Sequence, residues 1–268
     1  MGRYQIARSL AISFVLVGLG ASGLLGQLYR DTLLPIDREN SAPEQSAAKA
    51  EFYFARLVYT DPYFGQDLSE RPWHIDSPAA ERHFLQGVAR LSNIDANSKE
   101  HYAMPAGEDF FDYPWLYCVE PGWWDLTDEE VDRIREYLLR GGFLVLDDFH
   151  GTQEWGSFQR GMSKIFPDRP IVDVGPEDEI FHTLYDANPG EQIPGLQFVY
   201  SGRTYERDGV QPQWKGVYDD DGRLMVMINH TMDLGDAWEH ADLPEYPERY
   251  TAMAYRMGIN YILYSMTH

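Results

Sequence analysis

The stretch DLTDEEVDRIREYLLRGGFLVLDD, residues 125–148, decides the fold class. Its first part predicts a helix, because Asp125 or Thr127 can cap the start, acidic residues fill the first turn and Gly141 ends it. The apolar residues that would form its inner face are Val131, Ile134, Leu138 and Leu139. The apolar run FLVLDD then predicts a buried strand that ends on two carboxylates, Asp147 and Asp148.

Strand and helix patterns continue on both sides of this stretch. The elements predicted before it are a strand over 51–60 (EFYFARLVYT), a helix over 79–92 (AAERHFLQGVARLS) and a buried strand in 113–124 (YPWLYCVEPGWW) that breaks at Pro121. The elements predicted after it are a short helix over 157–166 (SFQRGMSKIF), a β-hairpin over 215–230 that turns at Asp221 and Gly222, and a helix over 248–267. Strands and helices joined by short connections indicate an α/β domain, with a mostly parallel sheet sandwiched by helices and a C-terminal β-hairpin and helix. We expect one such domain over residues 51–268.

The composition limits the partners of the chain. It contains 43 acidic and 22 basic residues, which gives a formal net charge of −21. Such a surface repels phosphate backbones, so we expect no nucleic-acid partner. The single cysteine, Cys118, excludes an intramolecular disulfide and a cysteine-based metal cluster.

The first residues are typical of an export signal. Arg3 and Arg8 precede an uncharged, largely apolar run over residues 9–28, which predicts a signal peptide or an N-terminal membrane anchor over residues 1–28. A polar linker follows over residues 29–50, and we expect the body of the protein to be extracytoplasmic, either periplasmic or at the cell surface. The G-x-G-x-x-G spacing of Gly18, Gly20 and Gly23 belongs to this export segment, because no second strand and acidic residue follow it as a dinucleotide site requires.

Polar side chains are predicted to gather at one edge of the sheet, because ligands of open parallel sheets bind beyond the carboxyl ends of the strands. The candidate catalytic residues are Asp147, Asp148 and His150. The candidate ligand-binding residues are Trp73, His74, Asp76, Glu120, Trp155 and Asp233, with His230 beside them. Carboxylates and imidazoles at one edge could hold a divalent metal ion or act as general acid and base. The structural alternative is that the aspartates cap a helix or hold a loop.

Four segments, ARLVY, YPWLYCVEPG, LTDEEVDRIREYLLRGGFLVLDD and RMGINYILYSMT, together resemble the bacterial domain of unknown function family 4159 over residues 52–267. The resemblance implies a class I glutamine amidotransferase-like, flavodoxin-like fold, whose relatives include sugar-utilisation proteins of the trehalose-utilisation type. Amidotransferases carry a nucleophilic cysteine at the strand end that corresponds to FLVLDDFHG, and this chain has none there. Cys118 lies one strand earlier and reads as a small core residue, so we expect no glutaminase chemistry.

These observations leave three functions open. The first is an amidotransferase-like module without the cysteine nucleophile, which binds a carbohydrate or a protein partner of the cell envelope in a strand-end cleft. The tryptophans expected to rim that cleft are Trp73, Trp123, Trp124 and Trp155. The second is a carboxylate- or metal-dependent hydrolase of cell-envelope carbohydrate, and the third is an assembly component that the linker tethers to the membrane.

The first two functions predict different geometries. A hydrolase requires the carboxylates to share a site that solvent reaches, with the pKa of at least one of them raised. A binding module predicts that Asp148 accepts hydrogen bonds from backbone amides of the loop that follows it.

Overall fold

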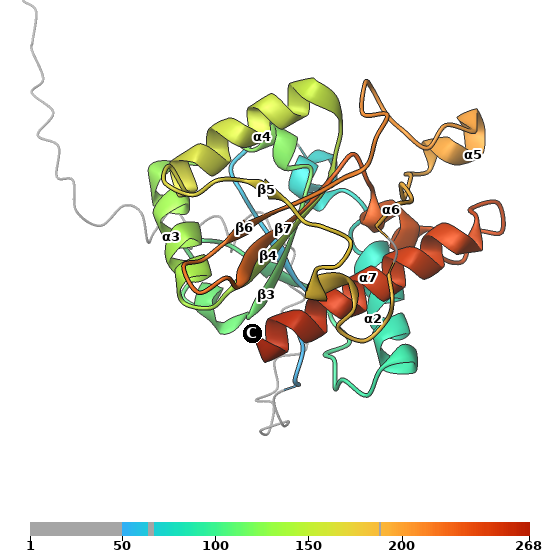
Figure 1. Ribbon diagram of the computed structural model, residues 1–268, viewed down its shortest axis with the longest axis horizontal. Coiled ribbons are helices and arrows are strands. Elements are labelled where there is room, and N and C mark those ends of the chain that lie inside the picture. The colour runs from blue at the N-terminus through green and yellow to red at the C-terminus, as the bar shows by residue number, and fades with distance from the viewer. Residues whose placement is uncertain (1–49, 64–66, 188) are drawn as a thin grey trace, which may run out of the picture. The chain divides into compact units, whose positions relative to one another are not determined.

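The computed structural model describes residues 50–63, 67–187 and 189–268 (Figure 1). The predicted signal or anchor over residues 1–28, and the predicted linker as far as residue 49, lie outside the described residues. Among the described helices, none is long and apolar enough to cross a membrane.

A seven-stranded sheet forms the centre of the domain, in the order β2-β1-β3-β4-β7-β6-β5. Its strands are β1 (Ala55–Leu57), β2 (His101–Ala103), β3 (Trp115–Val119), β4 (Phe143–Phe149), β5 (Val172–Asp173), β6 (Gln213–Tyr218) and β7 (Leu224–His230). Neighbours from β2 to β7 pair in parallel, whereas β6 and β5 add an antiparallel edge. The predicted mostly parallel sheet and the predicted hairpin are both confirmed.

Helices cover both faces of the sheet (Figure 1). On one side, α2 (Ala79–Leu91), α6 (Leu234–Glu239) and α7 (Glu248–Thr267) contact one another. On the other side, α3 (Asp128–Leu139) packs against α4 (Gly151–Ile165). The short helix α5 (Gln197–Ser201) lies in the connection between β5 and β6. Single 3₁₀ turns occupy Leu68–Glu70, Pro72–His74, Phe110–Asp112, Pro121–Trp123 and Glu179–Phe181.

The cap of α3 is Thr127, one of the two residues that the sequence allowed. Its hydroxyl accepts a hydrogen bond from the Glu130 N–H at 3.2 Å, and the Glu130 carboxylate accepts one from the Thr127 N–H at 2.8 Å. This reciprocal capping box satisfies two N–H groups that a helix start leaves without partners. Glu130 also accepts from the N–H of Thr60 at 2.9 Å, which joins the helix start to the loop after β1.

Two local predictions are wrong. Leu139 is 48% exposed, and Tyr137 takes its place on the buried face of α3. The helix α4 begins at Gly151, six residues before the predicted start at Ser157. The missed turn contains two glycines, Gly151 and Gly156, which lower helix propensity, and His150 offers no side-chain cap. The earlier start places the first turn of α4 directly after the end of β4.

Candidate functional site

Three acidic residues at the carboxyl edge of the sheet adopt the left-handed backbone region. The φ angles are 66° at Asp76 in the loop after β1, 49° at Glu120 directly after β3 and 53° at Asp148 in the irregular last part of β4. Aspartate tolerates this region, but a glutamate directly before Pro121 adopts it rarely. Such conformations cluster at binding and active sites, where the surrounding structure holds them.

Asp147 points into the protein and is fully buried. Its Oδ2 accepts hydrogen bonds from the hydroxyl of Tyr117 at 2.7 Å and from the N–H groups of Leu234 at 2.8 Å and Gly235 at 3.1 Å. Its Oδ1 accepts from the side-chain amide of Asn229 at 3.3 Å. Burial raises the pKa of Asp147 to about 6, although these hydrogen bonds oppose the rise. Asp147 therefore anchors the first turn of α6.

Asp148 lies beside Asp147 and belongs to what we call the acidic centre, the carboxylates of Asp76, Asp148, Asp233 and Asp236. Burial raises the pKa of Asp148, and the charges of Asp236 and Asp147 raise it further. Burial and the neighbouring carboxylates likewise raise the pKa values of Asp76 and Asp233. Buried carboxylates that repel one another in this way do not all ionise without a positive charge nearby.

The oxygen atoms of the acidic centre converge. One carboxylate oxygen each from Asp76, Asp233 and Asp236 lies within 4.8 Å of the others. The point that a Cβ would occupy on Gly195 lies 2.5 Å from Asp233 Oδ2, 2.7 Å from Asp236 Oδ2 and 2.7 Å from Gln197 Oε1. Among the described residues, Asp76 Oδ2 and both amide atoms of Gln197 are buried without a hydrogen-bond partner. Buried polar atoms without partners call for an explanation, and where several carboxylate and amide oxygens converge, an ion is one that the chemistry supports.

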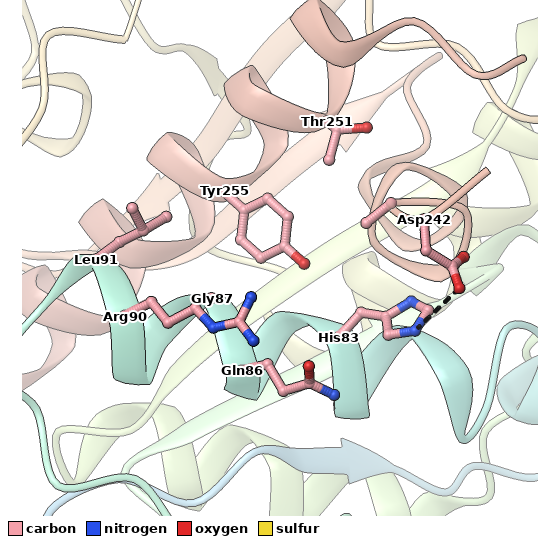
Figure 2. Close-up of a pocket in the computed structure, with 9 residues that line it drawn as sticks. His83, Gln86, Gly87, Arg90, Leu91, Asp242, Thr251 and Tyr255 are labelled. Atoms are coloured by element: carbon pink, nitrogen blue, oxygen red, sulfur yellow. Dashed lines mark ion pairs between the residues drawn. The ribbon is translucent and has the colours of Figure 1, made fainter. Parts of the chain in front are cut away.

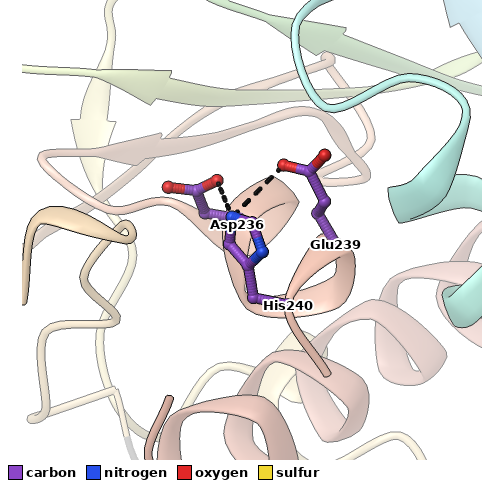
Figure 3. Close-up of side chains that lie close together, drawn as sticks. All are labelled: Asp236, Glu239 and His240. Atoms are coloured by element: carbon purple, nitrogen blue, oxygen red, sulfur yellow. Dashed lines mark ion pairs between the residues drawn. The ribbon is translucent and has the colours of Figure 1, made fainter. Parts of the chain in front are cut away.

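Asp236 also belongs to a second group, with Glu239 and His240 (Figure 3). The Nε2 of His240 lies 3.3 Å from Asp236 Oδ1 and 3.4 Å from Glu239 Oε2. The hydrogen bond from Asp236 raises the pKa of His240. Burial alone would raise the pKa of Asp236, but the hydrogen bonds from His240 and from the N–H of Leu196 give a net decrease. Protonated His240 thus balances part of the negative charge.

Two side chains near Asp148, Glu120 and His150, have pKa values that are shifted in opposite directions. Burial and the charges of Asp148 and Glu154 raise the pKa of Glu120 to about 9. Burial lowers the pKa of His150, whose Nε2 lies 3.0 Å from Asp148 Oδ1 and whose Nδ1 is buried without a partner among the described residues. Near neutral pH, Glu120 therefore carries a proton that it can donate, and His150 is an imidazole that can accept one.

Glu154 holds this part of the site in place. Its carboxylate accepts a hydrogen bond from the N–H of His150 at 2.5 Å and pairs with Arg207 at 2.5 Å. Glu154 itself is 5% exposed.

The other predicted site residues lie in several environments. His74 is half-buried and stacks on Tyr102 with ring centroids 5.9 Å apart, and it does not belong to the acidic centre. Trp155 is half-buried against the buried His230, whose Nε2 lies 3.2 Å from the carbonyl oxygen of Gly151.

The expected tryptophan rim is partly wrong, because Trp73 is 0% exposed and Trp124 5% exposed. Trp123 remains half-exposed at the strand end.

Sequence reasoning missed Gln197, Asp236, Glu239, His240 and Glu154. The spacing in DLGDAWEH, residues 233–240, carries a usable signal, because positions 236, 239 and 240 share one face of a helix. Gln197 carries no such signal, since a long connection brings it to the site.

A separate cavity of about 470 Å³ lies between α2 and α7 (Figure 2). His83, Arg90 and Tyr255 line it, and Asp242 Oδ2 lies 4.0 Å from His83 Nε2. The Nδ1 of His83 lies 3.0 Å and 2.9 Å from the carbonyl oxygens of Trp238 and Glu239, so His83 donates a hydrogen bond to the end of α6. The residues that line this cavity are different from the four aspartates of the acidic centre.

The fold and the site define an α/β protein with a mostly parallel sheet and a buried acidic centre at the carboxyl edge of that sheet. The chain belongs to the family described as domain of unknown function DUF4159, whose profile matches residues 53–266. This match confirms the family that the sequence segments indicated. No curated protein matches the chain.

Proposed function

We propose that this protein is an extracytoplasmic hydrolase of cell-envelope carbohydrate that depends on a divalent cation held by the acidic centre. The observation that carries the proposal is the convergence of oxygens from Asp76, Asp233 and Asp236, together with buried oxygen atoms of Asp76 and Gln197 that have no partner among the described residues. Carboxylate and amide oxygens bind hard cations such as Ca²⁺, Mg²⁺ and Mn²⁺. A positive charge there would also relieve the repulsion within the acidic centre.

The remaining groups suit hydrolysis. When bound, a divalent cation lowers the pKa of a water molecule and polarises the bond to be broken. His150 has a lowered pKa and accepts a proton, while Glu120, with its pKa raised to about 9, donates one to the leaving group. Asp148 holds the His150 ring in position through the 3.0 Å contact.

The amidotransferase-like fold and the location are part of the same proposal. The five parallel strands follow the order of a flavodoxin-like doubly wound sheet, and Glu120 and the loop before Asp76 flank the point between β1 and β3 where that order reverses. Cys118 is fully buried, which agrees with the loss of cysteine chemistry. The two arginines and the apolar run of residues 9–28 support export.

A module that binds a carbohydrate or protein partner without catalysis is the second candidate. It is favoured by Asp147, since all the hydrogen bonds of this strand-end carboxylate are internal and two of them hold the start of α6. Asp148 does not show the loop contacts expected of it: its carboxylate lies 3.0 Å from His150 Nε2.

The test is release of reducing sugar from an extracted bacterial envelope polysaccharide by the purified full-length chain, with Ca²⁺, Mg²⁺ or Mn²⁺ and with EDTA. We expect cation-dependent release that Asp233→Asn and Glu120→Gln abolish and that Asp132→Asn, at an exposed position of α3, leaves unchanged. Cation binding without any release would support the binding module. Release that persists in EDTA would overturn the cation-dependent mechanism.

A further inference from the structure

A groove of about 460 Å³ runs between the turn after β3 and the helix α4. We call it the α4 groove. The lining residues that matter for binding are Trp123, Gln153, Glu154, Ser157, Arg160 and Lys164. It adjoins the candidate site, because Glu154 lines the groove and accepts the hydrogen bond from the N–H of His150.

Glycine is required where the turn after β3 meets α4. A Cβ on Gly122 would lie 2.7 Å from Glu154 Cβ, and a Cβ on Gly161 would lie 2.3 Å from Trp124 Nε1. Such distances are shorter than van der Waals contact, so any larger residue would push the turn away from the helix. The two glycines therefore keep the end of the groove against Glu154.

Two basic residues of the α4 groove, Arg160 and Lys164, lie next to each other on α4. Arg160 and Lys164 are exposed, one helical turn apart on α4, and like charges at this spacing oppose helix stability slightly. Among the described residues no carboxylate pairs with either, and their hydrogen bonds go to the backbone oxygens of Gly156 at 3.0 Å and Leu126 at 3.3 Å. Two adjacent cations that no described carboxylate pairs with form a positive spot in a chain with 43 acidic and 22 basic residues, and such a spot favours an anionic ligand.

The α4 groove also has an aromatic lining residue, Trp123. Trp123 is half-exposed; the tilted ring of Tyr63 lies 5.8 Å from it and the Arg207 guanidinium lies 6.0 Å from its centroid. The exposed part of an indole positioned in this way can pack against the apolar face of a sugar ring. Gln153 and Ser157 add hydrogen-bonding groups for hydroxyls, while Asp125 and Glu154 are the acidic residues of the groove. The Glu154 charge is balanced by Arg207.

We propose that the α4 groove binds an acidic sugar unit of a glycan, with its ring on Trp123 and its carboxylate between Arg160 and Lys164. The role of the groove as a substrate subsite rests on the proposed hydrolase function, since the glycan would continue past Glu154 toward Glu120 and Asp148. The binding itself requires no cation in the acidic centre.

The probe is a trimer of galacturonic acid, titrated into the full-length chain in EDTA and followed by tryptophan fluorescence and calorimetry. Maltotriose serves as the neutral control. We expect the acidic trimer to bind at least tenfold more tightly, and to bind more weakly as salt is raised, because salt screens exposed charges. Arg160→Gln with Lys164→Gln should weaken binding about tenfold, and Trp123→Ala should abolish the fluorescence change.

Matched controls separate the groove from general charge effects and from the cation site. Arg256→Gln with Lys99→Gln removes the same charge elsewhere and should leave binding unchanged. Asp233→Asn should abolish the cation response yet retain binding of the trimer, so the failure of one proposal is distinguishable from the failure of the other. Equal affinity for the acidic and neutral trimers, or full affinity in the groove double variant, would overturn the inference.

Discussion

The carboxylate of Asp147 accepts a hydrogen bond from the backbone N–H of Leu234 at 2.8 Å, which joins the end of β4 to the first turn of α6. Asp233 and Asp236, which flank that turn, are carboxylates of the acidic centre. One buried strand-end aspartate thus positions the helix, and its neighbour Asp148 faces the helix's acidic side chains. The two adjacent carboxylates that end β4 have different functions.

Replacing Asp147 should make the folded protein less stable. Asp147→Ala removes four hydrogen bonds and leaves the buried N–H groups of Leu234 and Gly235 without an acceptor, which should lower the free energy of unfolding by about 3 kcal/mol or more. Urea denaturation measures the change, with Asp132→Asn as an exposed control. A variant as stable as the wild type would show that Asp147 does not anchor α6.

Without a cation, stability should fall as the pH rises from about 7 to 9. At lower pH, buried histidines with lowered pKa values, such as His150 and His230, act in the opposite direction. The folded-state pKa values of Asp76, Asp148 and Asp233 are raised, and that of Glu120 rises from 4.5 to about 9. The folded state therefore keeps protons that the unfolded state releases. Their contribution is complete below the unfolded pKa values and is lost as the pH rises through the folded ones.

Melting temperatures across this pH range measure the effect. In EDTA we expect a steady decline with pH, and in saturating Ca²⁺ or Mn²⁺ a flatter profile, since a bound cation replaces the protons. Identical profiles in the two buffers would contradict the link between the carboxylates and a cation.

Two helical glycines should respond to alanine in opposite ways. A Cβ on Gly258 in α7 would lie 2.6 Å from Phe84 and 2.9 Å from Trp238, both fully buried, whereas a Cβ on Gly156 in α4 meets nothing within 4 Å. Gly258→Ala should lower the free energy of unfolding by about 1–3 kcal/mol through overpacking, and Gly156→Ala should raise it by up to about 1 kcal/mol through helix propensity. Urea denaturation of the pair checks both signs, and a stabilising Gly258→Ala would contradict the tight packing of α2, α6 and α7.

Cys118 should behave as a core residue. It is fully buried in β3, and burial raises the pKa of its thiol. A thiol-reactive dye such as DTNB should label the chain only after denaturation, because the thiolate is the reactive form. Rapid labelling of the native chain would contradict this and reopen the question of cysteine chemistry.

The sequence predicted the elements whose signals are local. The final helix has the predicted bounds, Glu248–Thr267, because Pro247 and a continuous helical pattern define it. The carboxyl edge of the sheet was predictable from strand patterns, and it does bring Asp76, Glu120, Asp148 and Asp233 to one region. The start of α4 was missed because its first six residues include two glycines and no side chain caps it.

The rest of the site depends on tertiary contacts that local patterns do not encode. Gln197 reaches the acidic centre from the connection between β5 and β6, so nothing near it in the sequence indicates its role. The end of β4 is irregular, with a positive φ at Asp148, so regular alternation along a strand does not predict which of Asp147 and Asp148 binds the backbone of α6. Trp73 and Trp124 resemble rim residues in the sequence but are buried in the domain.

Calorimetric titration of Ca²⁺, Mg²⁺ and Mn²⁺ into the full-length chain tests the central claim most directly. The acidic centre predicts one cation per chain, with affinity reduced at least tenfold by Asp233→Asn or Asp236→Asn and unchanged by Asp132→Asn. No binding of any of the three cations to the wild type, or equal binding by the Asp233→Asn variant, would contradict a cation site at the end of the sheet.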